Sequence, residues 1–332
     1  TLKGAEVAAA GLRLPATWTA PVVRAAGAAE GTPLAPLGDR LARALVAAAR
    51  SADATATLDA AFAGGAGSVT ISRARLAAAS GATATLDGAL AHRWPDGGLR
   101  FDADLRLAGG GLPALDLDLT RASADAPILG VARLREPYAA AGAALALTPV
   151  RFRAGGRGAT TVTTAATLTG PLGGGRVERL VLPIDARWSG GALVLNPSCT
   201  PVGAAQLAVA GLVLDRPRLS LCPTRGALVR AAGGRVSGGA RIAAAQLAGR
   251  LGSSPLSLQA AGAQLDLATR GFRVTGLQTR LGAPDRPTRL DFAALDGRIT
   301  GGTVAGSFTG GAGQIGAVPL ILGDAAGRWQ LA

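Results

Sequence analysis

Strict alternation of apolar and polar residues dominates much of this chain. Segment 99–107 places an apolar residue at every second position with charged residues between them, and segment 115–120 repeats the pattern with Leu and Asp. Successive side chains of a β-strand point to opposite faces of a sheet, so this pattern predicts strands with one apolar face and one face in water. An antiparallel sheet accommodates such strands.

The alternation recurs at 150–153, 182–188 and 256–274, and the chain's 49 glycines and 19 prolines punctuate it at turn-like intervals. We therefore predict a mostly β fold, a long, curved antiparallel sheet that forms an elongated apolar groove. Residues 55–332 supply its strands, and 1–332 form a single continuous segment. Gly155–Gly158 and Gly170–Gly175 are expected to be the loosest turns. The strands share a pattern without a fixed sequence period, which disfavours a strict solenoid.

The N-terminal part differs from the rest. Residues 36–50 space Leu37, Leu41 and Leu45 four apart behind a proline, which predicts one short amphipathic helix. This helix could act as a lid over an apolar surface or pack against the sheet as ordinary core. Residues 1–35 are rich in Ala and contain three prolines, which predicts weak strands or an irregular edge, so we expect 1–54 to be an irregular edge plus this helix.

An apolar sheet face of this length must be covered, either by another protein layer or by apolar ligands. The residues expected on that face, and hence the candidate lining of the groove, are Leu99, Phe101, Leu105, Leu107, Leu115, Leu117, Leu119, Val150, Phe152, Leu182, Ile184, Trp188, Leu256, Leu258, Leu265, Leu267, Phe272 and Val274.

The sequence offers little for catalysis, and we do not expect an enzyme. His92 is the only histidine and stands in a turn-like segment, so a nucleophile–histidine pair would have to use it. One histidine and two cysteines give no zinc-ligand spacing, and we expect neither metal nor cofactor. Carboxylates two apart, such as Asp102 and Asp104, fit a solvated strand face better than a glycosidase pair.

One glycine pattern resembles a nucleotide-binding motif. Gly311, Gly313 and Gly316 form G-x-G-x-x-G, but the following residues contain Pro319 and read as a strand, whereas a pyrophosphate would require the N-terminus of a helix. We expect a flexible turn between two terminal strands.

Basic residues exceed acidic ones, 34 against 21, and Lys3 is the only lysine. The arginines stand singly on polar strand faces, without a basic run or interleaved aromatic residues, which argues against nucleic acid as a partner. Contact with anionic lipid head groups fits this charge.

The two cysteines, Cys199 and Cys222, lie beside prolines in one unit of short alternating segments. A disulfide between them would clamp neighbouring strands, and a loop of this size would stabilise the fold by roughly 3 kcal/mol. Such a bridge indicates an oxidising compartment such as the periplasm. The alternative is a pair of reduced core cysteines.

The chain contains no methionine and begins with Thr1, which suggests a piece of a longer protein. No run of 18 strongly apolar residues occurs, so any signal sequence or membrane anchor is expected outside these residues.

Several segments resemble a known family. NPSCTPV at 196–202, LSLCP at 219–223, GRITGGTVAGSFTG at 297–310 and the final GRWQLA resemble YdbH-type members of the AsmA-like family of Gram-negative envelope proteins, which belong to the repeating β-groove lipid-transfer proteins. The resemblance is firmest over 130–332. It rests on patterns of strands and cysteines and not on a catalytic signature.

The resemblance implies a periplasmic bridge anchored to the inner membrane through a segment outside this chain. Its apolar groove would bind phospholipid acyl chains and conduct lipid to the outer membrane, with inner- and outer-membrane proteins at its ends. Two alternatives remain from the residues alone: a structural or adhesive envelope β-sandwich or solenoid with a dry core, and a glycan-active or glycan-binding β protein. The scarcity of aromatic residues argues against the second.

Overall fold

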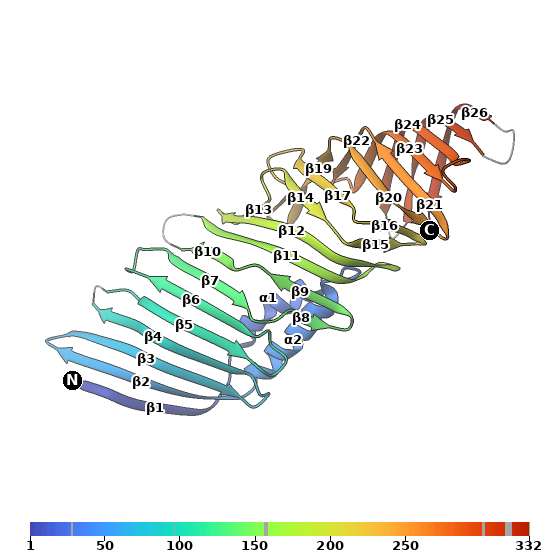
Figure 1. The fold of residues 1–332 in the computed structure, drawn as a ribbon. Helices are drawn as coiled ribbons and strands as arrows, with labels where there is room; N and C mark the ends of the chain where they lie inside the picture. The colour runs from blue at the N-terminus through green and yellow to red at the C-terminus, as the bar shows by residue number, and fades with distance from the viewer. Residues whose placement is uncertain (28, 96, 156–158, 301–302, 316–320, 332) are drawn as a thin grey trace. The chain divides into compact units, whose positions relative to one another are not determined.

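A computed structural model describes residues 1–27, 29–95, 97–155, 159–300, 303–315 and 321–331 of the chain. The protein is mostly β, and every strand pairing in the described residues is antiparallel, which confirms the predicted fold class (Figure 1). The chain divides into two compact units, Thr1–Pro171 and Leu172–Ala332. We describe each unit by itself.

The N-terminal unit is a meander whose neighbouring strands are mostly consecutive in sequence. The strand β7 pairs with β10, β10 and β9 both pair with β11, and β8 pairs with β9. Its strands are β1 (Leu2–Leu12), β2 (Ala52–Ala63), β3 (Ala66–Ala78), β4 (Thr83–Trp94), β5 (Arg100–Ala108), β6 (Leu115–Arg121), β7 (Ile128–Leu134), β8 (Tyr138–Ala140), β9 (Ala143–Leu147), β10 (Val150–Ala154) and β11 (Thr160–Leu172).

Cross-strand register follows the predicted alternation. Leu105 of β5 lies opposite Leu117 of β6, while Asp104 lies opposite Asp118 on the other face. A slip of one residue would exchange the two faces and place these carboxylates among leucines, so the pattern fixes the register. Residues 99–107 and 115–120 are confirmed as strand segments, except that Leu99 immediately precedes β5.

The unit contains two helices, α1 (Ala16–Gly27) and α2 (Ala35–Ala49). The second confirms the helix predicted at 36–50. For residues 1–35, the prediction of weak strands is correct at β1, whereas the alternative of an irregular edge is wrong where α1 forms. Proline and alanine obscured α1, but Thr19, Val22 and Ala26 are its less exposed positions and are spaced as on one helical face.

Helix α2 packs against the ends of several strands. Ala44 belongs to a cluster with Ala52, Ala78 and Leu112, and partly buried Leu76 and Leu107 of the sheet pack against this cluster. The helix is therefore core for this part of the sheet, as the simpler of the two readings of the sequence proposes. Helix α1 packs on α2.

Polar contacts fix α2 to the sheet. Arg40 donates hydrogen bonds to the carbonyl oxygens of Gly111 and Ala139, and its guanidinium lies 5.2 Å from the ring centroid of Tyr138. The Tyr138 hydroxyl donates to Gly111 O at 2.9 Å, and burial raises the pKa of this tyrosine. In the contact between the helices, an added Cβ at Gly38 would lie 3.1 Å from Ala26, so glycine permits the close approach.

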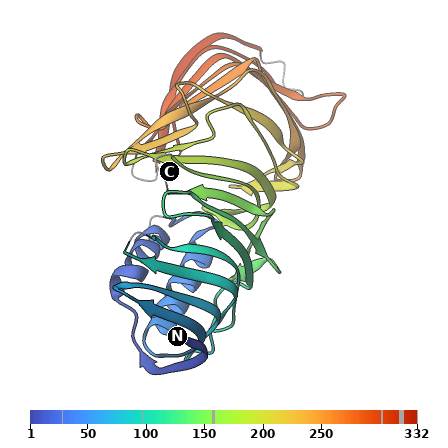
Figure 2. The ribbon, with the colours of Figure 1, turned by 90° about the vertical axis from the view of Figure 1, so that its left-hand side faces the viewer.

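The C-terminal unit is also antiparallel, but several of its strands are short and pair with strands that do not follow them directly in sequence (Figures 1 and 2). One long strand, β12, pairs successively with β15, β14 and β13. The strands are β12 (Gly175–Ser189), β13 (Ala192–Leu195), β14 (Thr200–Gly203), β15 (Gln206–Val209), β16 (Leu212–Asp215), β17 (Arg218–Pro223), β18 (Val229–Ala232), β19 (Arg235–Ile242), β20 (Ala245–Leu251), β21 (Ser254–Ala260), β22 (Gly262–Asp266), β23 (Gly271–Leu281), β24 (Thr288–Thr300), β25 (Thr303–Gln314) and β26 (Ile321–Leu331).

Two glycine segments differ from expectation. Gly311 and Gly313 lie inside β25 and form no turn; Gly316 lies outside the described residues. Gly311 lies opposite Phe292, and its added Cβ would come within 3.1 Å of the Phe308 ring, so Gly311 makes room for an aromatic side chain. Of the expected loose turns, Gly170 belongs to β11 and Gly175 to β12, while 156–158 lie outside the described residues.

Asn196 bridges the break between β13 and β14. It is 4% exposed and has a φ of 49°, a left-handed conformation that asparagine tolerates. Its side-chain oxygen accepts from the Asp185 amide and its side-chain nitrogen donates to Pro183 O, each at 2.8 Å. Its own amide donates to Asp185 O at 2.7 Å. Asn196 thereby satisfies backbone groups of Pro183 and Asp185 in β12 that have no strand partner at this break.

We predict that Asn196→Ala lowers the free energy of unfolding of the C-terminal unit by about 2–4 kcal/mol, because it leaves buried backbone groups unpaired and strains the left-handed residue. Asn196→Gly should cost about 1 kcal/mol less, because it relieves only the strain. Urea unfolding measures the difference, and exchange of the Asp185 amide should accelerate in both variants.

The matched control is Gln206→Ala, which removes an amide that bonds Asp215 at an exposed pair. It should change stability by less than about 0.5 kcal/mol. Equal stabilities of the Asn196→Ala variant and this control would contradict the role assigned to Asn196.

Candidate functional site

The register places most of the predicted lining residues of the N-terminal unit on one face, which we call the N-terminal apolar face. Leu117 lies opposite Leu105 on one side and Ala132 on the other, and Ala132 lies opposite Val150. The predicted residues that share this face are Phe101, Leu105, Leu107, Leu115, Leu117, Leu119, Val150 and Phe152, all of them half-buried. Leu99, also half-buried, lies just before β5.

The N-terminal apolar face is covered only in part. Helix α2 packs on it near Leu76 and Leu107. Among the described residues, no second sheet packs against the remainder. The half-buried state of its leucines therefore reflects packing against lateral neighbours within one layer.

The predicted residues of the C-terminal unit form separate groups. Leu265 lies opposite Phe272, and Val274 lies opposite Ala263, on one face of β22 and β23. The remaining predicted residues are distributed over other elements: Leu182, Ile184 and Trp188 along β12, Leu256 and Leu258 along β21, and Leu267 in the turn after β22.

Exposure differs between these groups. Leu256 is buried, whereas Trp188 is 54% exposed. Val177 of β12 is the largest fully buried side chain among the described residues. No helix covers this unit's described sheet. Trp188 is therefore the most accessible of the predicted residues here.

Sequence reasoning missed other apolar residues that lie opposite one another on neighbouring strands. Val177 lies opposite Leu207, which lies opposite Leu214, and the last two belong to strands of only four residues. In the N-terminal unit, Leu90 lies opposite Phe101. The alternation in 84–90 was the signal that could have found Leu90. Leu207 and Leu214 lie in strands too short for an alternating pattern to be recognised.

Aromatic rings on the strands repeatedly lie over glycines. Phe152 is paired with Gly130, Phe272 with Gly297 and Trp94 with Gly67, and a Cβ added to any of these glycines would lie within about 2.1–2.3 Å of ring atoms. The rings therefore occupy the space above a residue without a side chain. This arrangement makes the large rings part of the sheet surface.

The opposite face carries exposed ion pairs. Arg133 bonds Asp118 at 2.5 Å, and Arg135 lies 3.7 Å from Asp116, with all four side chains substantially exposed. These carboxylates are thus neighbours of arginines on a solvated face. The described residues hold no cluster of three or more His, Cys, Asp or Glu side chains that could bind a metal ion.

His92 lies in strand β4, opposite Val69, so its placement in a turn-like segment was wrong. Its ring stacks on Trp94 with centroids 5.9 Å apart. The ring of Trp94 also packs against that of Phe62, with centroids 5.4 Å apart. The turn signal that misled the assignment, Pro95 with the following Asp and Gly, begins only after the strand ends.

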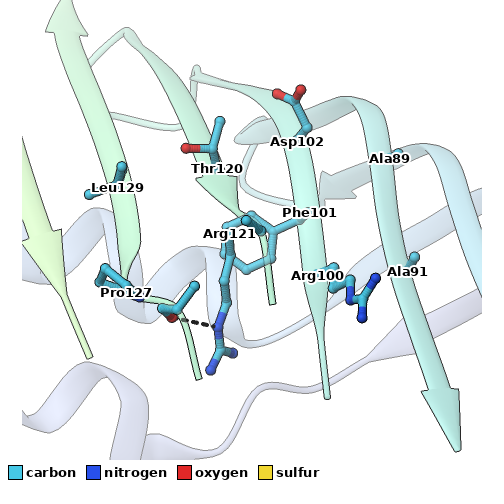
Figure 3. A pocket seen from close by; sticks show the side chains of 11 residues that line it. Ala89, Ala91, Arg100, Phe101, Asp102, Thr120, Arg121, Pro127 and Leu129 are labelled. Atoms are coloured by element: carbon cyan, nitrogen blue, oxygen red, sulfur yellow. Dashed lines mark hydrogen bonds between the residues drawn. The ribbon is translucent and has the colours of Figure 1, made fainter. Parts of the chain in front are cut away.

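A pocket of about 430 Å³ lies near one end of strands β4 to β7 (Figure 3). Ala89, Asp102, Thr120 and Leu129 are successive register partners, so they share the face opposite to that of Leu105 and Leu117. Only one of the predicted lining residues, Phe101, borders this pocket. The pocket is therefore not the predicted groove.

Arg121 fixes one border of this pocket. Its Nε donates to Ala126 O at 3.2 Å, the contact drawn in Figure 3, and its terminal nitrogen donates to Ala124 O. The guanidinium of Arg121 therefore holds the segment after β6 in place through these hydrogen bonds. The remaining charged residues of the lining are Arg100 and Asp102, and Thr120 contributes a hydroxyl.

Cys199 and Cys222 form the predicted disulfide, with an S–S distance of 2.01 Å. Thr200 of β14 lies opposite Leu221 of β17, so the disulfide links the start of β14 to its neighbouring strand β17. It lies three residues beyond Asn196, next to the same break in the strand. A disulfide is compatible with an oxidising compartment such as the periplasm. Neither helix in the described part of the chain is long and apolar enough to span a bilayer.

We predict that replacing both cysteines by serine lowers the stability of the C-terminal unit by about 3 kcal/mol, because the open loop gains conformational entropy in the unfolded state. Urea unfolding measures the loss of stability. Hydrogen exchange should show that the amides with reduced protection lie in the C-terminal unit. Dithiothreitol should reproduce the loss in the native chain and have no further effect on the variant. A native chain whose unfolding does not respond to the reductant would contradict the prediction.

Comparison of this chain with known protein families, with curated proteins and with solved structures finds no match. The two sheet faces and the resemblance noted in the sequence are therefore the features of this chain that bear on its function.

Proposed function

We propose that the protein binds phospholipid acyl chains on its apolar sheet faces and conducts lipid between the inner and outer membranes, without covalent chemistry. The observation that carries the proposal is that, among the described residues, the face with Leu105 and Leu117 has no second sheet packed on it. The chain exposes 19498 Å², whereas two compact units of half its mass would together expose about 15,000 Å². The chain therefore exposes more surface than two compact units of this mass would.

The energetics favour an acyl chain as the cover. Each methylene transferred from water contributes about 0.8 kcal/mol, so ten methylenes contribute roughly 8 kcal/mol before the cost of ordering the lipid. The rows of leucines repeat from strand to strand, with Leu105, Leu117 and Val150 in neighbouring positions. Neighbouring positions of similar chemistry allow a lipid to move along the face in small steps.

The rings that lie over glycines support the same use. With Phe152 above Gly130 and Phe272 above Gly297, large apolar side chains extend along the sheet. A surface of this kind offers broad contact area to a flexible chain. A sandwich would instead require a second sheet to interdigitate with it.

Compartment and partners follow from the disulfide and from the resemblance to the AsmA-like envelope proteins. We propose a periplasmic location, an inner-membrane anchor in a segment outside this chain, and membrane proteins at both ends of the full-length bridge. A net charge of +13 suits anionic lipid head groups.

The first test is purification of the chain from bacterial periplasm under mild conditions, followed by mass spectrometry of its organic extract. We expect stoichiometric phospholipid. A folded protein free of lipid would contradict the proposal and support a structural role in the envelope.

We further predict that Leu117→Asp reduces the co-purified lipid at least about tenfold, because a desolvated carboxylate opposes acyl contact. Thr163→Asp is the control, since it adds the same charge on the other face, opposite Arg151. It should retain lipid. Trp188→Asp applies the same test to the C-terminal unit at a side chain exposed enough to tolerate it. Full lipid retention by both folded lining variants would contradict the assignment of the face.

A further inference from the structure

Helix α1 leaves much of its surface without a protein partner. It packs on α2, whereas Trp18 is 70% and Val23 is 46% exposed. Of its twelve residues only Arg24 is charged. A helix that faces water ordinarily carries polar residues on its outer side, so this composition indicates another environment.

A pocket of about 450 Å³ adjoins the first turn of α1 and the last turn of α2. Its lining combines apolar side chains, including Leu14 and Val46, with Arg13 and Arg50, and it includes no carboxylate. Across 13–50 the acidic residues are outnumbered by arginines: Glu30 and Asp39 against Arg13, Arg24, Arg40, Arg43 and Arg50.

We propose that α1 and this pocket bind the surface of an anionic lipid bilayer. Trp18 and Val23 enter the boundary between head groups and acyl chains, and Arg13, Arg24 and Arg50 lie near lipid phosphates. Tryptophan suits this boundary because its ring is largely apolar and its N–H is polar. Arginine is attracted by the negative surface potential and keeps its stem in apolar surroundings.

The size of the surface favours a bilayer over a protein partner. A stable protein interface buries roughly 800 Å² on each side with good shape complementarity, which one helix of twelve residues supplies poorly. A bilayer adapts its shape to the helix and presents the complementary charge. The inference goes beyond acyl binding on the sheet faces, because it concerns a different surface.

The test uses the full chain and vesicles of phosphatidylglycerol with phosphatidylcholine, compared with phosphatidylcholine alone, in a flotation assay. We expect at least about tenfold stronger binding to the anionic vesicles, and a marked loss as salt rises from about 0.1 M to several times that value. Equal binding to both vesicles, or none, would overturn the proposal; a protein partner would then be the occupant to seek.

Two variants locate the surface. Trp18→Ser and the double variant Arg13→Gln with Arg50→Gln should each weaken binding to anionic vesicles about tenfold. Ile321→Ser, at a side chain that is 79% exposed in the C-terminal unit, and the double variant Arg235→Gln with Arg298→Gln are the controls. They should bind as the native chain does. Loss in the controls equal to that in the variants would overturn the assignment to α1.

The outcome is separable from that of acyl binding. The Leu117→Asp chain should dock on anionic vesicles as well as the native chain does, although it is expected to co-purify with much less lipid. A native chain that carries lipid but does not float with vesicles would overturn the docking proposal and leave the proposed function intact.

Discussion

The cross-strand register that gathers the leucines of the N-terminal unit on one face is the constraint on which the structure depends. Leu105, Leu117 and Val150 can share a face only because the register is maintained over several strands. The same register brings Asp104 opposite Asp118 on the solvated face, where water and neighbouring arginines reduce their repulsion. A sheet sorted in this way is stable in one register and leaves one face in need of a cover.

Two devices maintain this order where strands break or side chains are large. Asn196 and the Cys199–Cys222 bridge hold the rows of the C-terminal unit together at one interruption, the first through hydrogen bonds to β12 and the second through a covalent link to β17. Glycines such as Gly130 and Gly297 give aromatic rings a place on the sheet surface. Both devices preserve the single layer without adding a second one.

The sequence predicted what depends on local period and failed where a few residues interrupt it. The alternation in 99–107, the leucine spacing of α2 and the cysteine pair were each sufficient. Helix α1 was missed because Pro15 and Pro21 disguise its periodicity. The faces of the C-terminal unit could not be followed through residues with positive φ, such as Arg179 and Gly276, where simple alternation need not continue. The pocket in Figure 3 depends on Arg121 bonding carbonyls of a later segment, which no pattern encodes.

Helix α2 links the two proposed lipid contacts. It packs on α1 and also on the N-terminal apolar face at Leu76 and Leu107. Arg40 ties it to the carbonyl oxygens of Gly111 and Ala139, and the Tyr138 hydroxyl bonds the same Gly111 carbonyl. Swinging the helix pair away from the sheet would therefore expose apolar core and break both hydrogen bonds of Arg40. A lipid that reaches this unit would move over the part of the face that α2 leaves uncovered, with the helices fixed in place beside it.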